Sequence, residues 1–169
     1  RISFKPAPNA DFNADNACTN NLATFTDNST TSTGSLTGWS WNFGDLGTSI
    51  AEDATHAYSA PGTYTVTHVV FSSNGCRDTI QKPLEIYTLP QALFHQNTPC
   101  VGNATQFVDD SQSPSGSIIG WNWLFGDNSS SGIQNPTHAY SSAGNYTVAM
   151  TVTSSFGCKD TIIKQITVI

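Results

Sequence analysis

The sequence contains two copies of one pattern, separated by a constant offset of 82 residues without a gap. An aromatic block in the first half recurs in the second, so that Trp39 and Trp41 correspond to Trp121 and Trp123. A His-x-Tyr pair, a Gly-x-Tyr-x-Val segment and two cysteines recur at the same distance. A fixed long period indicates two tandem copies of a self-contained module. Such a duplication favours reach, spacing and multivalency over a single catalytic cleft.

Charge and hydropathy exclude several classes of partner. The net charge is −6, and the six basic residues are scattered along the chain, so nucleic acid and anionic membranes are poor partners. No apolar run approaches the ~20 residues that cross a membrane, and no signal peptide is visible. We therefore expect a mature chain or a part of a longer one.

The four cysteines predict stabilisation by disulfide bonds. Modules of about 82 residues are only marginally stable without cross-links, and an even number of cysteines in a chain rich in Thr, Ser and Asn is typical of a secreted protein. Four cysteines allow three pairings, of which only Cys18 with Cys76 and Cys100 with Cys158 treats both repeats alike. We expect this pairing, with each bond inside one module, closing a loop of about 58 residues and contributing ~4 kcal/mol.

Residue alternation predicts an all-β chain. No stretch shows sustained i, i+3, i+4 apolar spacing, whereas alternation by two residues is frequent. Alternating apolar and Thr side chains along 63–72 indicate one buried and one solvated sheet face. Clusters of Gly, Pro, Asn and Ser separate the segments at the spacing of a two-sheet sandwich. The strands expected in the first repeat, and again 82 residues later, are 10–15, 22–27, 38–43, 54–58, 63–72 and 77–87.

The repeat boundaries predict a rod of two modules. We assign residues 6–87 to the first module and 88–169 to the second, and we expect the short connection, followed by Pro90, to be stiff. Residues 1–5 align with the last strand of each repeat. We expect them to be the closing strand of a preceding repeat or an N-terminal extension, with Ile2 and Phe4 as candidates for strand donation to a neighbour.

Three blocks of residues resemble the PKD (polycystic kidney disease) domain family. The first repeat reads Trp-Asn-Phe-Gly-Asp at 41–45, Thr-His-Ala-Tyr at 55–58 and Gly-Thr-Tyr-Thr-Val at 62–66, and the second has corresponding blocks. The family pattern is W-x-F-G-D-G, T-H-x-Y and G-x-Y-x-V. The chain departs from it at the glycine that ends the first block, where it has Leu46 in the first repeat and Asn128 in the second. The resemblance implies two immunoglobulin-like sandwiches of about seven strands each. The cysteine positions are similar to those of repetitive surface and gliding-associated adhesins of Bacteroidota.

The four tryptophans are expected to fall into two groups. Trp41 and Trp123 are predicted core anchors, with each indole N–H bonded at a strand edge. Trp39 and Trp121 precede these residues by two positions on the same strands. They are therefore expected on the same side of the sheet, near the rim of the sandwich. We interpret them first as packing residues, and contact with a sugar or another ligand is the alternative.

Asp45 with His56, and Asp127 with His138, are the candidate acid–base pairs. A hydrolase also needs a nucleophile or a second carboxylate at a defined separation, and neither glutamate of the chain is repeated. We therefore interpret these residues as closing turns through hydrogen bonds to the backbone, and we expect no enzyme activity. His68, which has apolar neighbours, is expected to be a core histidine.

No cofactor is expected, and calcium is the one metal that the sequence leaves open. A zinc site needs closely grouped ligands, whereas the cysteines of each repeat are far apart. Calcium binds flexible oxygen cages, but Asp11 and Asp15 align with Leu93 and Asn97, so a site in the first repeat alone is the remaining alternative. The aspartates in loop-rich regions are Asp11, Asp15, Asp27, Asp53, Asp109 and Asp110.

Short motifs predict that the chain is a candidate glycoprotein. Two Asp-Thr-Ile segments resemble the acceptor of Bacteroidota O-glycosylation, and their threonines are expected to point outward. The candidate positions are Thr79 and Thr161 in these segments, and Asn28, Asn103, Asn128 and Asn145 in Asn-x-Ser/Thr sequons.

These features predict a non-catalytic extracellular repeat segment, secreted or on a cell surface, that serves as stalk, filament or adhesin of a microbial surface protein. The expected partners are other copies or repeats of the same protein, surface proteins and carbohydrates. The alternative is an accessory substrate-binding or spacer module of a secreted hydrolase, in which Trp39 and Trp121 contact the substrate.

Overall fold

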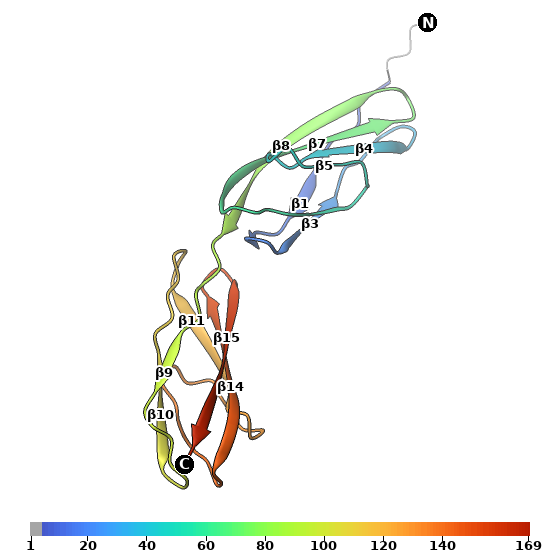
Figure 1. Cartoon of the computed structure of the whole chain (residues 1–169). Helices are drawn as coiled ribbons and strands as arrows, with labels where there is room; N and C mark the ends of the chain where they lie inside the picture. The colour runs from blue at the N-terminus through green and yellow to red at the C-terminus, as the bar shows by residue number, and fades with distance from the viewer. Residues whose placement is uncertain (1–4) are drawn as a thin grey trace, which may run out of the picture. The chain divides into compact units, whose positions relative to one another are not determined.

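The computed structural model describes residues 5–169, and all regular secondary structure in this range is β-strand (Figure 1). The all-β prediction is therefore confirmed. The chain divides into two compact units between Tyr87 and Thr88. Within residues 5–169 we find no helix of the length and apolarity needed to cross a membrane. Ile2 and Phe4, the candidates for strand donation, lie outside the described residues.

The first module is a sandwich of two sheets. One sheet has the order β1-β3-β6, and the other has the order β2-β8-β7-β4-β5. Paired strands are antiparallel, except that β2 runs parallel to β8. The strands are β1 Phe12–Ala14, β2 Ala17–Cys18, β3 Leu22–Asp27, β4 Leu36–Asn42, β5 Thr48–Ser49, β6 Ala54–Ala57, β7 Gly62–Ser72 and β8 Arg77–Tyr87.

The second module repeats this arrangement, except that residues 99–100, which correspond to β2, do not form a strand. Its sheets have the orders β13-β10-β9 and β12-β11-β14-β15, and all of its strand pairs are antiparallel. The strands are β9 Phe94–Gln96, β10 Ala104–Asp109, β11 Ile118–Leu124, β12 Ser130–Ser131, β13 Thr137–Ala139, β14 Gly144–Ser154 and β15 Lys159–Val168.

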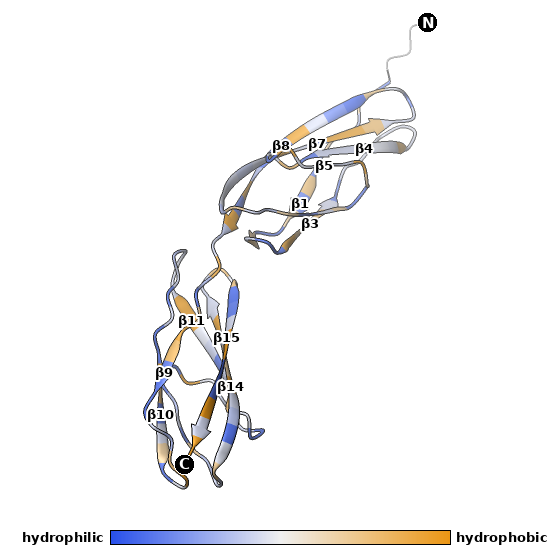
Figure 2. Ribbon diagram, viewed as in Figure 1, coloured by the Kyte–Doolittle hydropathy of each residue, from blue (hydrophilic) through white to orange (hydrophobic). Residues whose placement is uncertain are grey.

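The long central strand of each module shows how alternation positions the core. On β7 the side chains of Val66, His68 and Val70 are buried, and those between them are more exposed. Hydrophobic residues accordingly occur at intervals along the strands in Figure 2. Because successive side chains of a strand point to opposite faces, one face of β7 packs into the sandwich and the other meets solvent, as predicted.

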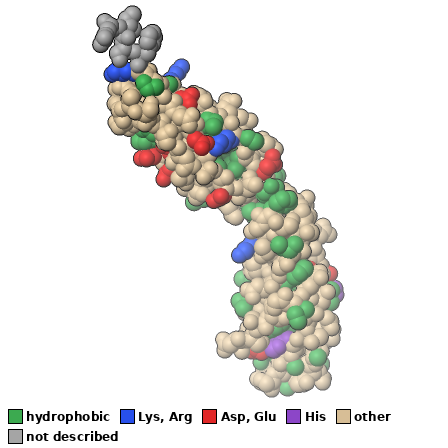
Figure 3. Space-filling view, turned by 180° about the vertical axis from the view of Figure 1, so that it is seen from behind, with side chains coloured by type: hydrophobic (Ala, Val, Ile, Leu, Met, Phe, Trp, Pro, Cys, Tyr) green, Lys and Arg blue, Asp and Glu red, His purple; other side chains and the backbone are tan. Residues whose placement is uncertain are grey.

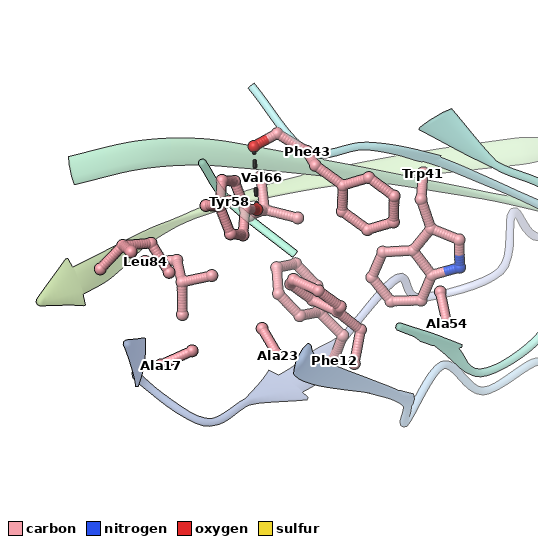
Figure 4. Packing of buried hydrophobic residues seen from close by; sticks show 11 residues of the cluster. Phe12, Ala17, Ala23, Trp41, Phe43, Ala54, Tyr58, Val66 and Leu84 are labelled. Atoms are coloured by element: carbon pink, nitrogen blue, oxygen red, sulfur yellow. Dashed lines mark hydrogen bonds between the residues drawn. The ribbon is translucent and has the colours of Figure 1, made fainter. Parts of the chain in front are cut away.

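A buried tryptophan lies at the centre of each core, as predicted. Trp41 is 1% exposed, and Phe12 and Phe25 pack against it with ring centroids at 5.3 and 5.7 Å. Figure 4 shows the rings of Trp41 and Phe12, together with the hydrogen bond from the Tyr58 hydroxyl to the Phe43 carbonyl at 3.0 Å. The indole Nε1–H of Trp41 donates to a backbone carbonyl at 2.8 Å. Truncating such an aromatic to Ala costs ~3–5 kcal/mol.

The turn after the buried aromatic block uses left-handed backbone at two positions. Gly44 has φ +87°, and a Cβ there would lie 2.8 Å from the carbonyl oxygen of Thr65, so glycine is required. Leu46 also has a positive φ of 78°, and Asn128 has 73° at the equivalent position. The turn thus keeps the backbone conformation suited to glycine, although neither residue is glycine.

The cysteines of the first module lie at opposite ends of its longest hairpin. Cys76 is in the turn that precedes β8, whereas Cys18 pairs in register with Tyr87 at the far end of β8. A strand rises about 3.3 Å per residue, so β8, with 11 residues, separates these ends by ~33 Å. A disulfide needs Cα atoms within about 7 Å. The predicted bond between Cys18 and Cys76 is therefore wrong.

The same geometry applies in the second module. Cys158 lies in the turn before β15, and Cys100 lies beside the end of that strand, where the Val101 N–H donates to the Ile169 carbonyl at 2.9 Å. The predicted bond between Cys100 and Cys158 is wrong for the same reason. In the structure Cys18 and Cys158 are each disulfide-bonded, whereas Cys76 and Cys100 are free thiols.

Candidate functional site

A hydrogen bond between a tryptophan and an aspartate from different sheets closes the rim of each sandwich. Trp39 lies on β4 and Asp27 ends β3, and the indole Nε1–H donates to the Asp27 Oδ2 at 2.7 Å. In the second module Trp121 donates to Asp109 in the same way, also at 2.7 Å. Both indoles are half-buried. The rim tryptophans thus use their N–H groups to hold the two sheets together while part of each ring meets solvent.

Asp27 is stabilised as a charged acceptor. Its side chain is 4% exposed, and this burial by itself raises the pKa of the carboxyl. Hydrogen bonds from Ser29, His68 and Trp39 outweigh the burial, so the pKa of Asp27 lies below its ordinary value. The carboxylate therefore remains ionised inside the rim at neutral pH.

His68 distinguishes the first module from the second. Its ring is fully buried and stacks on Trp41 at a centroid distance of 3.6 Å, as expected for a core histidine. Its Nε2 lies 3.0 Å from Asp27, and its Nδ1 has no hydrogen-bond partner among the described residues. The second module has Met150 at this position, also fully buried. The Asp109 carboxylate therefore lacks a histidine partner.

The second module has a polar hollow of about 300 Å³ at its tryptophan rim. Gln134 donates from Nε2 to the Asp109 Oδ2 at 3.1 Å, the oxygen that also accepts from Trp121. The pKa of Asp109 is lowered, because bonds from Ser111, Trp121 and Gln134 outweigh the effect of burial. An indole beside hydroxyl, amide and carboxylate groups suits a hydroxyl-rich ligand. The lining residues are Asp109, Ser111, Ser113, Gly116, Ser117, Ile118, Trp121 and Gln134.

Sequence reasoning found Trp121 and missed most of this hollow. Gln134 corresponds to Glu52 in the first repeat, so comparison of the repeats does not mark it as shared. The serines come from the segment between β10 and β11, which lies outside the strands that the sequence predicts. The one feature of the sequence that could have indicated the hollow is the difference between the repeats at this position, where Gln134 stands in place of Glu52.

The Asp–His pairs close turns, as interpreted from the sequence. His56 Nε2 lies 2.7 Å from Asp45 Oδ2, and Asp45 Oδ1 accepts the Gly47 N–H at 2.9 Å. The imidazole stacks on Phe43 at 4.4 Å. The pKa of Asp45 is lowered, because hydrogen bonds from His56 and Gly47 outweigh its partial burial. A ring held between a carboxylate and an aromatic face stabilises the turn.

The second module adds a serine to this arrangement, but the three residues do not form a catalytic triad. Ser129 Oγ lies 3.3 Å from His138 Nε2 and also donates to Asp127. Asp127 binds the same Nε2 at 2.7 Å. A triad requires the nucleophile on one ring nitrogen and the orienting carboxylate on the other. With both partners on Nε2, the histidine is not arranged to activate the hydroxyl.

The family model described as PKD domain matches residues 5–86 and, separately, residues 88–168. The chain belongs to the PKD domain family. The two matches agree with the two sandwiches, and PKD domains are typically non-catalytic accessory modules.

Two bacterial enzymes contain a segment similar to one PKD module. Collagenase ColA of Bacillus cereus is 40% identical over 69 residues, which are 38% of this chain and 7% of the enzyme. A microbial collagenase of Vibrio alginolyticus is 40% identical over 70 residues, which are 40% of this chain and 9% of the enzyme. The chain therefore spans less than a tenth of the length of these relatives.

A solved structure of fibronectin(III)-like modules of CbhA from Clostridium thermocellum resembles the whole chain. The TM-score is 0.55 at 10% identity, with 95% of this chain and 93% of that chain covered. At this identity the likeness shows the fold alone, namely two consecutive β-sandwich modules.

Among the described residues of the PKD modules, the aspartates considered for calcium do not form a group that could hold a metal ion. Within residues 5–169, no three Asp, Glu, His or Cys side chains lie close enough to hold a metal ion. Asp11 instead pairs with Lys82 at 2.6 Å, and Asp53 accepts the backbone N–H of Asp27 at 2.8 Å. Asp110 pairs with His95 at 2.6 Å. The structure gives no support to a calcium site among these residues.

The candidate glycosylation positions lie on the surfaces of the PKD modules. On the face shown in Figure 3, charged side chains are scattered and most of the surface is uncharged. Glycosylation at these positions stays a prediction. The exposed positions are Asn28, Thr79, Asn103, Asn128, Asn145 and Thr161.

Proposed function

We propose that the chain is a non-catalytic segment of an extracellular protein, in which PKD modules act as spacers within a stalk, filament or adhesin of a microbial surface protein. One observation carries this proposal. The Trp–Asp, Asp–His and Tyr–carbonyl bonds of the first module recur in the second with nearly the same lengths. These polar groups are bonded within their own module and stabilise its fold. A second copy therefore adds length and surface rather than a second reaction centre.

The start of the second module also supports a spacer. The Thr88 N–H donates to Ser115 Oγ at 3.3 Å, and Gln91 exchanges backbone hydrogen bonds with Gln112 at 2.8 and 3.0 Å. Between them, Pro90 restricts the backbone. The chain therefore enters the hydrogen-bonded structure of the second module directly after β8 ends at Tyr87. A connection without a Gly/Ser tether is stiff.

Small-angle X-ray scattering tests the stiff spacer. A sandwich built on an 11-residue strand is about 36 Å long, so two stiffly joined modules should have a maximum dimension of ~70–80 Å with a narrow distance distribution. Both chains are measured in reducing buffer, which opens every disulfide, so that only the peptide connection is compared. The matched control carries a Gly/Ser insertion of about eight residues between Tyr87 and Thr88, which should broaden the distribution. Equal breadth for the two chains would show that the natural connection is flexible and would contradict the proposal.

An accessory module of a secreted hydrolase is the second candidate function. The observation that favours it is the 40% identity to segments of two collagenases. The hollow beside Trp121 would then contact the substrate, either a collagen-like protein or a polysaccharide. The first module, with Glu52 where the second has Gln134, would contribute less.

Pull-down on insoluble substrates tests this candidate. Fibrillar collagen and insoluble polysaccharides are incubated with the whole chain and with the variants Trp121→Ala and Gln134→Ala, and circular dichroism verifies their folding. Retention that is lost in both variants supports substrate contact at the hollow. Trp39→Ala is the matched control in the other module. No retention of the unaltered chain on any substrate would exclude this function for the tested ligands.

A further inference from the structure

The outer face of the larger sheet in the second PKD module carries a hollow of about 510 Å³, which we call the apolar hollow. Three of its lining residues form one cross-strand row, because Leu124 on β11 lies opposite Ala149 on β14, which lies opposite Ile163 on β15. Leu124 and Ile163 are 50% and 64% exposed. The small side chain of Ala149 lies between these two larger ones and leaves space above it.

The turn that follows β11 closes one end of the apolar hollow. Gly126 has φ +86°, and a Cβ there would lie 2.7 Å from the carbonyl oxygen of Thr147, so this turn lies directly against β14. Asn128 and Ser129 of the turn line the hollow together with Thr147. Ser129 is already hydrogen-bonded to Asp127. The side-chain amide of Asn128, in contrast, has no hydrogen-bond partner among the described residues.

The first module has polar side chains in the same row. The residues equivalent to Leu124, Ala149 and Ile163 are Asn42, Thr67 and Gln81. Gln81 Nε2 donates to Thr67 Oγ1 at 3.0 Å, and Asn42 Oδ1 accepts the Gly44 N–H at 2.9 Å. These polar groups are therefore bonded within their own module. The second module replaces them by an open apolar row, at three positions that only the sheet brings together.

The lining residues define which chemical groups the apolar hollow can hold. Among the described residues that line it, none is charged or aromatic. A charged ligand group would lose its hydration without gaining a partner of opposite charge, and a sugar ring would find no aromatic face for stacking. Aliphatic walls suit an apolar side chain. The free amide of Asn128 has both a donor and an acceptor, which match the C=O and N–H groups of a peptide backbone.

We propose that the apolar hollow binds a short, uncharged, extended peptide segment of a partner protein. One apolar side chain of this segment lies over Ala149, between Leu124 and Ile163, and Asn128 bonds the peptide backbone beside it. The volume of about 510 Å³ lies within the range of ~300–1,000 Å³ that is usual for binding pockets. The inference goes beyond the proposed spacer function, and its failure would leave the scattering test of the spacer unaffected.

Two-dimensional NMR of the isotope-labelled whole chain tests the proposal. The probe is the capped peptide acetyl-Thr-Leu-Thr-amide, and the comparison probes are acetyl-Thr-Glu-Thr-amide and methyl β-glucoside. The leucine peptide should shift the amide signals of residues 124–129, 147–149 and 163 saturably, while the signals of the first module serve as an internal reference. The absence of these shifts would overturn the proposal. Equal binding of the glutamate peptide, or binding of the glucoside alone, would contradict an uncharged peptide as the ligand.

Variants of the second module separate the apolar contact from the backbone contact. Ala149→Thr with Ile163→Gln installs the polar pair of the first module, so the fold should be kept, and the affinity for the leucine peptide should fall by ~10-fold or more. Asn128→Gly removes the amide but suits the left-handed backbone, and it should weaken binding by ~2–10-fold. Thr151→Ala, on the same strand outside the lining, is the matched control. Unchanged affinity in the first two variants, or an equal loss in Thr151→Ala, would overturn the proposal.

Discussion

Replacing Leu46 by glycine should stabilise the first module, although it removes a hydrophobic side chain. Leu46 is 97% exposed, so the side chain buries almost no apolar area. Its φ of 78° lies in the left-handed region, which costs a non-glycine residue ~1–2 kcal/mol. The bond from the Gly47 N–H to Asp45 at 2.9 Å spans this position and prevents the backbone from relaxing.

The magnitude follows from two opposing terms. Glycine removes the left-handed penalty of ~1–2 kcal/mol, but it increases the entropy of the unfolded chain, which costs ~0.4–1 kcal/mol. Leu46→Gly should therefore raise the free energy of unfolding by about 0.5–1 kcal/mol, or ~3–6 °C in Tm for a module of this size. Asn128→Gly should gain less, because asparagine tolerates left-handed backbone.

Hydrogen exchange followed by mass spectrometry measures the effect separately in each module. Amides of β7 report on the first module, and amides of β14 in the same chain provide the internal reference. Leu46→Ala is the matched control, since it shortens the side chain but keeps the strained backbone, and its stability should stay within ~0.5 kcal/mol of the natural chain. If Leu46→Ala slows amide exchange in β7 as much as Leu46→Gly does, the argument that left-handed backbone strain lowers the stability is refuted.

Two further predictions concern the tryptophan rim. Trp39→Phe removes the N–H that bonds Asp27 and should lower the stability of the first module by ~1.5–3 kcal/mol. Trp121→Phe should lower the stability of the second module by less, because Gln134 still donates to the same carboxylate oxygen of Asp109. Equal losses of stability for the two variants in denaturant titrations would count against this reasoning. The pKa of Asp27 is lower in the folded module than its ordinary value, so its contribution is fully present above pH ~4 and is lost as the pH falls through the folded pKa. In acid titrations followed by tryptophan fluorescence, the stability of Asp27→Asn should fall less steeply with decreasing pH than that of the natural chain. An unchanged pH dependence would contradict the contribution assigned to Asp27.

Most of the strand framework was predictable from the sequence. The expected segment 22–27 coincides with β3, and 77–87 coincides with β8, because their apolar residues alternate and turn residues flank them. The two-residue strands β2 and β5 were not predicted. A strand of two residues has no period to detect, and its existence depends on a neighbouring strand.

The candidate site was predictable only in part. Parity placed Trp39 and Trp121 on the side of the core tryptophans, and the structure adds their bonds to Asp27 and Asp109. These aspartates end strands of the opposite sheet, and nothing local to the tryptophans marks them. Sequence spacing cannot report a contact across two sheets, because it depends on how the sheets face each other.

The sequence by itself determined that the chain contains two similar all-β modules with a tryptophan in each core. The 82-residue period and the alternation of apolar residues require this, since burial of one strand face is a local property of the pattern. The partners of the cysteines were decided by tertiary structure alone. An 11-residue strand carries the chain the whole length of the sandwich, so the two cysteines of a repeat lie at opposite ends and cannot bond each other.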